Sequence, residues 1–178
     1  MADNDALLTN QMPHSPQAEQ AVLGSMLIDA DCVKDVMDQL QTQDFYLRTN
    51  RDIFETIYQM FVYSKPIDGV TVAGEMEKNG KSNEQTRSYL VQLMEVTPTS
   101  ANVMEYVRIV QEKSLMRQVA FAAGRITAMV QQGTGSAGDM LEAAEQRIYA
   151  IRRGRSAQGM VPVSMVLGDV MSQLAELS

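Results

Sequence analysis

The longest uninterrupted helical pattern in the sequence runs from Pro98 to Gly133, and it constrains the fold more than any other feature. Thr99 and Ser100 are candidate N-cap residues after the proline, and Gly124 is the one weak helix former inside the pattern. About thirty residues at 1.5 Å per residue give a helix on the order of 45 to 50 Å long, longer than a head of about 100 residues is wide. Part of this helix must therefore project from a compact domain that precedes it.

The segment after this helix predicts a second long helix that runs back along the first. Gly133 and Gly135 favour a chain reversal, and Ser136 and Asp139 have the spacing of a capping box. Apolar residues then recur at helical spacing until Gly154. They are Met140, Leu141, Ala144, Ile148 and Ile151. We therefore expect residues 99–154 to form an antiparallel helical hairpin.

One face of the first hairpin helix is a candidate surface for self-association. Its residues are Val119, Ala122, Ala123, Ile126 and Val130. A two-helix arm cannot bury both of its faces, and small side chains allow another helix to approach closely. The alternative is that this stripe packs only on the returning helix. Of the two, we favour self-association.

The residues before Pro98 predict a compact head of five shorter helices, because apolar side chains recur there at helical spacing between capping and turn residues. Phe45 and Tyr46 form a short extended anchor on its core. The first expected helix begins after Ser15 and ends near Ile28, and the second follows Asp29 or Asp31. The third starts at the capping-box pair Thr49 and Asp52 and ends near Ser64. The fourth starts at Thr71 and ends at Gly80, and the fifth covers residues 84–95.

The fold class is therefore all-α, with four parts along the chain. Residues 1–14 show no periodicity and are expected to be a flexible N-terminal arm, followed by a helical head over residues 15–98 and the helical hairpin over residues 99–154. Residues 155–178 are expected to be a linker and a docking helix.

The docking helix is predicted from a heptad-like seam that starts at Val163. The seam residues expected to bind a partner are Leu167, Val170, Leu174 and Leu177. A short amphipathic helix on a tether is typical of a docking element. It could equally fold back on the hairpin.

Composition places the chain among ordinary globular proteins, with 45% hydrophobic and 21% charged residues. No apolar run approaches the length of a membrane span, and the acidic N-terminus is unlike a signal peptide, so a cytoplasmic location and no membrane partner are expected. Residues 1–100 carry 15 acidic and 7 basic side chains, a net charge of −8. Direct binding of nucleic acid by this half is therefore expected to be weak or absent.

Arginines gather near the end of the returning helix, and they are the exception to this acidity. They are Arg147, Arg152, Arg153 and Arg155. They could contact phosphates, but cations also suit the dipole at a helix C-terminus, and we favour that interpretation.

No constellation for catalysis, cofactor binding or metal binding is found in the sequence, so the chain is expected not to be an enzyme. The segment from Gly74 to Ser82 resembles a phosphate-binding loop, but it has five residues between its glycines instead of four and follows a helix instead of a strand. His14 is the single histidine and Cys32 the single cysteine. Cys32 is expected to be a buried packing residue.

Short motifs in a fixed order resemble the N-terminal domain of the bacterial replicative DNA helicase, the DnaB family. The resemblance spans about residues 12 to 153. The motifs are AEQAVLGSMLID at Ala18 to Asp29, DFY at Asp44 to Tyr46, IF at Ile53 and Phe54, PID and VTV between Pro66 and Val72, YL at Tyr89 and Leu90, PTSANV at Pro98 to Val103, and IVQEKS followed by Arg117. The double glycine common before the YL pair is replaced here by polar residues around Gln85 to Arg87.

The resemblance implies a role in assembly and docking. In that family the head and hairpin form a collar above a motor ring, with hairpins pairing into dimers and three dimers closing a hexamer. The implied partners are other copies of the chain, primase, the motor domain of a neighbouring subunit and a helicase loader. Tyr89, Arg117 and Ile126 are the implied partner-facing residues, although Tyr89 and Ile126 could instead belong to the core. The parent enzyme would use ATP and Mg to unwind DNA, whereas this chain is expected to hold no cofactor.

Two other functions stay open at this point. One is a free-standing phage or plasmid primosome accessory protein that has the same fold and binds primase or helicase. The reading frame downstream of Ser178 would separate it from a helicase fragment. The other is binding of single-stranded DNA through Arg147 to Arg155, which would be sensitive to salt.

Overall fold

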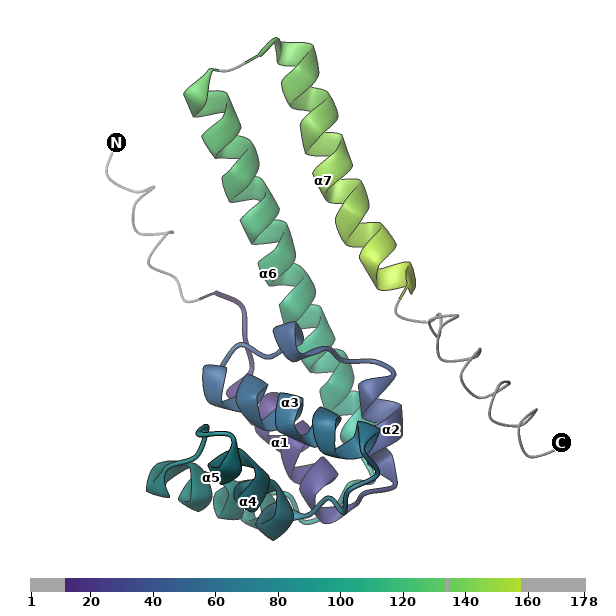
Figure 1. Ribbon diagram of the computed structural model, residues 1–178. Coiled ribbons are helices and arrows are strands. Elements are labelled where there is room, and N and C mark those ends of the chain that lie inside the picture. The colour runs from purple at the N-terminus through teal and green to yellow at the C-terminus, as the bar shows by residue number, and fades with distance from the viewer. Residues whose placement is uncertain (1–11, 134, 158–178) are drawn as a thin grey trace, which may run out of the picture. The chain divides into compact units, whose positions relative to one another are not determined.

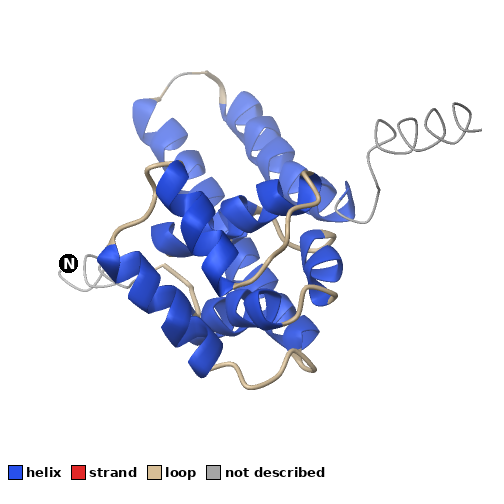
Figure 2. Ribbon diagram, turned by 60° about the horizontal axis from the view of Figure 1, so that its bottom comes forward, coloured by secondary structure: helices blue, strands red, loops and turns tan. Residues whose placement is uncertain are grey.

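The computed structural model describes residues 12–133 and 135–157, and its regular elements within these ranges are all helices (Figure 2). The all-α prediction is confirmed. The elements are α1 (Pro16–Ile28), α2 (Cys32–Met37), the short 3-10 helix η1 (Thr42–Asp44), α3 (Arg48–Val62), α4 (Gly69–Lys78), α5 (Glu84–Glu95), α6 (Val103–Gln132) and α7 (Ala137–Ala157).

The chain divides into two compact units, and the border lies inside α6 between Phe121 and Ala122. In the first unit, α1 packs against α5, α3 and α2, and α4 packs against α3 and α5 (Figure 1). The core of this unit takes its side chains from all of these helices and from the first turns of α6. Its largest fully buried members are Phe45, Phe54, Leu23, Met26, Ile53, Ile57, Met76, Leu90 and Leu93.

Several helix ends follow the predicted local chemistry. Ser15 caps α1 by accepting a hydrogen bond from the amide of Ala18 at 3.3 Å, and Pro16 occupies the first turn. Gly80 and Gly133 follow α4 and α6 with positive φ angles of 66° and 62°, the left-handed conformation that ends helices. The fifth helix covers residues 84–95 as expected.

Four helix ends differ from the prediction. The third helix starts at Arg48 and the fourth is capped by Asp68, with Thr71 three residues later as its reciprocal partner. The sixth helix starts at Val103, and the hydroxyl of Ser100 donates to the carboxylate of Asp29. The seventh helix continues through Gly154 to Ala157.

The second unit contains the end of α6 and the whole of α7. The turn between them has the predicted capping box: the carboxylate of Asp139 accepts hydrogen bonds from the amide and hydroxyl of Ser136, at 2.9 and 2.7 Å, and the Ser136 hydroxyl accepts one from the Asp139 amide. After this turn α7 runs back in the direction opposite to residues 122–132, so the hairpin is present. No helix in the described ranges is long and apolar enough to cross a membrane.

Candidate docking site

Arg117 joins three segments of the first unit. It lies on α6, only 5% exposed, and its Nη1 atom donates to the carbonyl oxygen of Pro13 at 2.7 Å. Its Nη2 atom donates to the carbonyl oxygen of Asp44. Burial lowers the pKa of the guanidinium, whereas the carboxylates of Glu19 and Asp44 act in the opposite direction. Arg117 is thus an internal connector in this structure and presents little surface to a partner.

Tyr46 provides an aromatic surface beside Arg117. The guanidinium carbon lies 5.6 Å from the centre of the Tyr46 ring, within the range of a cation–π interaction. The His14 ring stacks on Tyr46, with 4.3 Å between ring centres and 21° between ring planes. Pro13 and His14 are therefore docked on the head, which differs from the loose arm expected for residues 12–14; residues 1–11 lie outside the described ranges.

Glu19 is a buried carboxylate that the sequence analysis did not single out. It is 1% exposed and accepts hydrogen bonds from the Tyr46 amide at 2.6 Å, the Leu47 amide at 3.3 Å and the Asn50 side-chain amide at 2.7 Å. Through these hydrogen bonds Glu19 holds the start of α3 and the segment that leads into it. A signal was available, because Glu19 shares a helix face with Val22, Leu23 and Met26 at intervals of three, four and seven residues.

Asn50 connects Glu19 with Tyr89. Asn50 is fully buried, and its side-chain oxygen accepts a hydrogen bond from the Tyr89 hydroxyl at 2.9 Å. Burial raises the pKa of the Tyr89 hydroxyl, while hydrogen bonds with Gln20 and Asn50 act in the opposite direction. Tyr89 is half-buried on α5 and packs against the core. Two of the predicted docking residues, Tyr89 and Arg117, thus border the same buried polar cluster.

Asp44 is also buried, at 3% exposure, and sequence reasoning did not identify its role. Its carboxylate accepts hydrogen bonds from the hydroxyl of Ser114 at 2.6 Å and from the amide of Gln41 at 2.7 Å. The aspartate of the DFY motif therefore fixes η1 against α6. Glu19, Asp44 and Arg117 belong to three of the family motifs, and their contacts connect these motifs in one structural network.

The predicted self-association residues lie along α6 with different exposure. Val119 and Val130 are 46% and 58% exposed, and Ala123 is exposed as well. Ala122 is buried at 9%, and Ile126 is half-buried. Ile126 was also predicted to face a partner, and its side chain is partly exposed.

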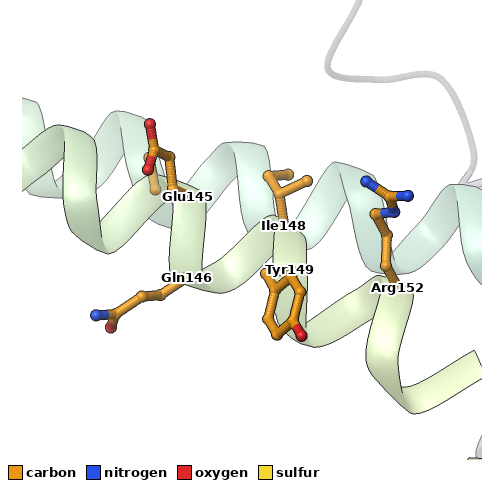
Figure 3. Close-up of a pocket in the computed structure, with 6 residues that line it drawn as sticks. Glu145, Gln146, Ile148, Tyr149 and Arg152 are labelled. Carbon is orange, nitrogen blue, oxygen red and sulfur yellow. The ribbon is translucent and has the colours of Figure 1, made fainter.

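The second hairpin helix is apolar on its surface too. On α7, Leu141, Ile148 and Tyr149 are 63%, 42% and 64% exposed. A shallow hollow along this helix is lined by Ala144, Glu145, Gln146, Ile148, Tyr149 and Arg152. Figure 3 shows Ile148 and Tyr149 projecting to different sides of the helix. Because all the lining residues come from one helix and do not converge, the hollow suits contact with another helix better than binding of a small molecule.

The remaining predicted residues are easily placed. Lys81, in the segment from Gly74 to Ser82 that resembles a phosphate-binding loop, forms an ion pair with Glu55 at 2.6 Å. Within the described residues no group of three or more metal-ligand side chains is found. Cys32 is buried, as predicted. Arg152 and Arg153 are exposed, and Arg147 is half-buried. The seam residues Leu167, Val170, Leu174 and Leu177 lie outside the described part of the chain.

Comparison with known protein families identifies the family to which the chain belongs. Residues 11–112 match the family described as DnaB-like helicase N terminal domain. The chain belongs to this family. The expected resemblance to DnaB is confirmed.

Individual DnaB relatives agree with this assignment. The replicative DNA helicase DnaB of Leifsonia xyli is 33% identical over 153 residues, which is 85% of this chain and 34% of that protein. The one from Mycobacterium leprae is 32% identical over 167 residues, 92% of this chain and 28% of that protein. The chain thus spans about a third of the length of the curated relatives it matches.

Two solved structures share the fold. The crystal structure of the N-terminal domain of DnaB helicase from Mycobacterium tuberculosis matches with a TM-score of 0.73 and 32% identity, covering 79% of this chain and 99% of that one. The N-terminal domain of DnaB helicase from Helicobacter pylori, a structure described with its interactions with primase, matches with a TM-score of 0.57 and 24% identity. It covers 64% of this chain and 89% of that chain.

Proposed function

We propose that this chain is the assembly and docking module of a replicative DNA helicase. The observation that carries the proposal is the exposed apolar surface of both hairpin helices in a member of the DnaB N-terminal family, with Val130, Leu141 and Tyr149 each more than half exposed. Burial of apolar surface is the main driving force for association, at roughly 25 cal/mol per Å². A second copy of the hairpin offers a surface of the same chemistry.

Assembly through the hairpin would produce dimers, and three dimers would close a hexameric collar. The proposed contact residues on α6 are Val119, Ala122, Ala123, Ile126 and Val130. The pairing of two identical faces fits a two-fold dimer interface, in which each copy contributes the same residues. Ala123, which is small and exposed, allows close approach of the two helices.

Docking of a primase is the second part of the proposed function. Tyr89 and Ile126 are each partly exposed, so their side chains can contact a partner directly. Arg117 is buried, and we propose that it acts by holding the Tyr46 surface in place. The other proposed partners are the motor domain of a neighbouring subunit, which the segment with Leu167, Val170, Leu174 and Leu177 would contact, and a helicase loader.

The chemistry of unwinding would belong to a part of the helicase other than this chain. We propose that the parent protein unwinds duplex DNA with ATP and Mg. The role of this chain would be structural: it would hold the motor domains in a ring and bring the primase next to them. A cytoplasmic location follows from this role in replication.

Sedimentation velocity tests the assembly. The chain is expected to form dimers or larger species at micromolar concentration, and Val130→Glu is expected to weaken association by at least about tenfold, because it places a charge in an apolar contact. Gln132→Glu is the matched control, since it adds the same charge to an exposed position of the same helix. A wild-type chain that stays monomeric at high micromolar concentration would count against the proposal.

Co-migration with a primase tests the docking. The chain and the primase of the same organism are mixed and separated by size-exclusion chromatography. A shared peak that is reduced by Ile126→Glu and unchanged by Gln132→Glu is the expected result. Separate peaks at concentrations where the chain is assembled would contradict primase docking and leave self-association intact.

A further inference from the structure

A continuous series of contacts connects Tyr89 on α5 with His14 before α1. The Tyr89 hydroxyl donates to Asn50, Asn50 donates to Glu19, and Glu19 accepts from the Tyr46 amide, at 2.9, 2.7 and 2.6 Å. The Tyr46 ring then stacks on His14. We call Tyr89, Asn50, Glu19 and Tyr46 the Glu19 relay. Its members come from α5, α3, α1 and the segment between η1 and α3.

The two side chains in the middle of the relay, Asn50 and Glu19, are buried, at 0% and 1% exposure. Water therefore cannot easily replace a hydrogen-bond partner that either side chain loses. A buried polar atom without a partner costs about 1–3 kcal/mol. If the Tyr89 hydroxyl is removed or drawn away, the Asn50 oxygen loses its donor. Rotation of the amide to find another partner would break the hydrogen bond to Glu19.

The far end of the relay, residues 12–14, is half-buried and lies outside the helices. Pro13 is bound through its carbonyl oxygen to Arg117, and His14 through its stack on Tyr46. The cap of α1 is formed by Ser15, after these residues, so residues 12–14 can leave the head without removing the first turn of α1. Chain ends outside the helices open at a lower free-energy cost than the core does.

We propose that Glu19 and Asn50 are positioning residues that couple the state of Tyr89 to the docking of residues 12–14 on Tyr46 and Arg117. A ligand that engages the Tyr89 hydroxyl would loosen residues 12–14, and release of these residues would in turn change the surroundings of Tyr89, because coupling between two sites is reciprocal. The coupling is a property of this chain alone. Its use as a signal of primase docking rests on the proposed function.

His14 gives the relay a direct readout, because it is the single histidine in the chain and its ring protons form one isolated set of NMR signals. The test variant is Tyr89→Phe, which removes one hydroxyl. The control is Tyr106→Phe, the same change at another partly buried tyrosine that packs against the core. A synthetic peptide of residues 10–17 gives the signals of undocked His14, and Arg117→Lys gives those of a directly weakened segment.

The expected result is that Tyr89→Phe moves the His14 signals toward the peptide values, in the same direction as Arg117→Lys, whereas Tyr106→Phe leaves them in place. The proposal is overturned if Tyr89→Phe leaves the His14 signals where the wild type and Tyr106→Phe have them. Circular dichroism confirms that each variant is folded. Because no primase is present, this result is independent of the test of primase docking.

A reciprocal measurement guards against a local packing effect at Tyr89. His14→Ala removes the stack on Tyr46 at a position before the first helix. It is expected to shift the ring signals of Tyr89 and to leave those of Tyr106 unchanged. Unchanged Tyr89 signals would overturn the coupling even if Tyr89→Phe had moved the His14 signals.

Discussion

At Gly24, α1 approaches α5 so closely that a side chain has no room. A Cβ atom there would lie 2.1 Å from the Thr97 hydroxyl oxygen and 2.5 Å from the Leu93 carbonyl oxygen. Gly24→Ala is therefore expected to destabilise the protein by about 1–3 kcal/mol, the usual cost of overpacking. Urea unfolding measures this change.

The matched control for Gly24 is Gly74 in α4, where a Cβ would meet no atom within 4 Å. Gly74→Ala is expected to stabilise the protein by about 0.5–1 kcal/mol, because alanine has the higher helix propensity. Opposite signs for these two substitutions are the decisive result. Equal effects would show that the close approach of α1 and α5 is not the cause.

Cys32 gives a second prediction at the residue scale. Burial, with the nearby carboxylates of Asp29 and Asp35, raises the pKa of the thiol from 9.0 to about 11. Because the thiolate is the reactive form, the folded protein at pH 8 is expected to react with a disulfide reagent about 100-fold more slowly than the unfolded chain, and more slowly still if access is limited. Equal rates in water and in denaturant would contradict the raised pKa.

The pH dependence of stability follows from the same thiol. Between pH 9.0 and about 11 the unfolded chain has lost the Cys32 proton and the folded protein still binds it, so the free energy of unfolding falls as the pH rises through this window. Urea unfolding at several pH values is expected to show a steeper loss in the wild type than in Cys32→Ala.

At the scale of elements, several helix ends were predictable from local chemistry, although the equally local cap of α4 by Asp68 was assigned to Thr71 instead. Ser15, Gly80 and Gly133 act within a few residues of their own helix, and the sequence shows such signals directly. The start of α3 was predicted less well, because the amides of Tyr46 and Leu47 are satisfied by Glu19, 27 and 28 residues away. A partner so distant in the sequence leaves no local signal.

The capping box of α7 yields a prediction at this scale. Hydrogen bonds from Ser136 lower the pKa of Asp139, so the cap stabilises the helix at pH values above the ordinary aspartate range and is lost as the pH falls through the lowered pKa. Asp139→Asn is expected to reduce the hydrogen-exchange protection of the first turn of α7 at neutral pH. Glu142→Gln, which removes a charge from an exposed position of the same helix, is the control.

At the scale of the whole molecule, the sequence predicted the class of the protein better than the location of its contacts. The spacing of apolar residues predicted the helices, and the motifs predicted the DnaB family. Periodicity alone did not separate buried from exposed members of one stripe, so Ala122 and Val130 were assigned alike although their exposures are 9% and 58%. It also did not predict that Arg117 is internal, because its carbonyl partners come from residues 73 and 104 positions away.

The border between the two units leads to the last prediction. The buried hydrophobic residues of the described chain lie between Ala18 and Val110, with Ala122 as the one member beyond this range. A fragment that ends at Phe121 keeps nearly all of this core and loses α7 and the end of α6. It is expected to unfold cooperatively in urea with a stability close to that of the full chain.

The same fragment is expected to be monomeric at concentrations where the full chain associates, because it lacks Val130, Leu141 and Tyr149. Sedimentation of both chains at equal concentration measures the difference. If the fragment folds and still associates as strongly as the full chain, the contact between copies lies on the head. In that case the exposed aromatic residues at the end of α3, Phe61 and Tyr63, become the first surface to mutate, since they are 40% and 73% exposed.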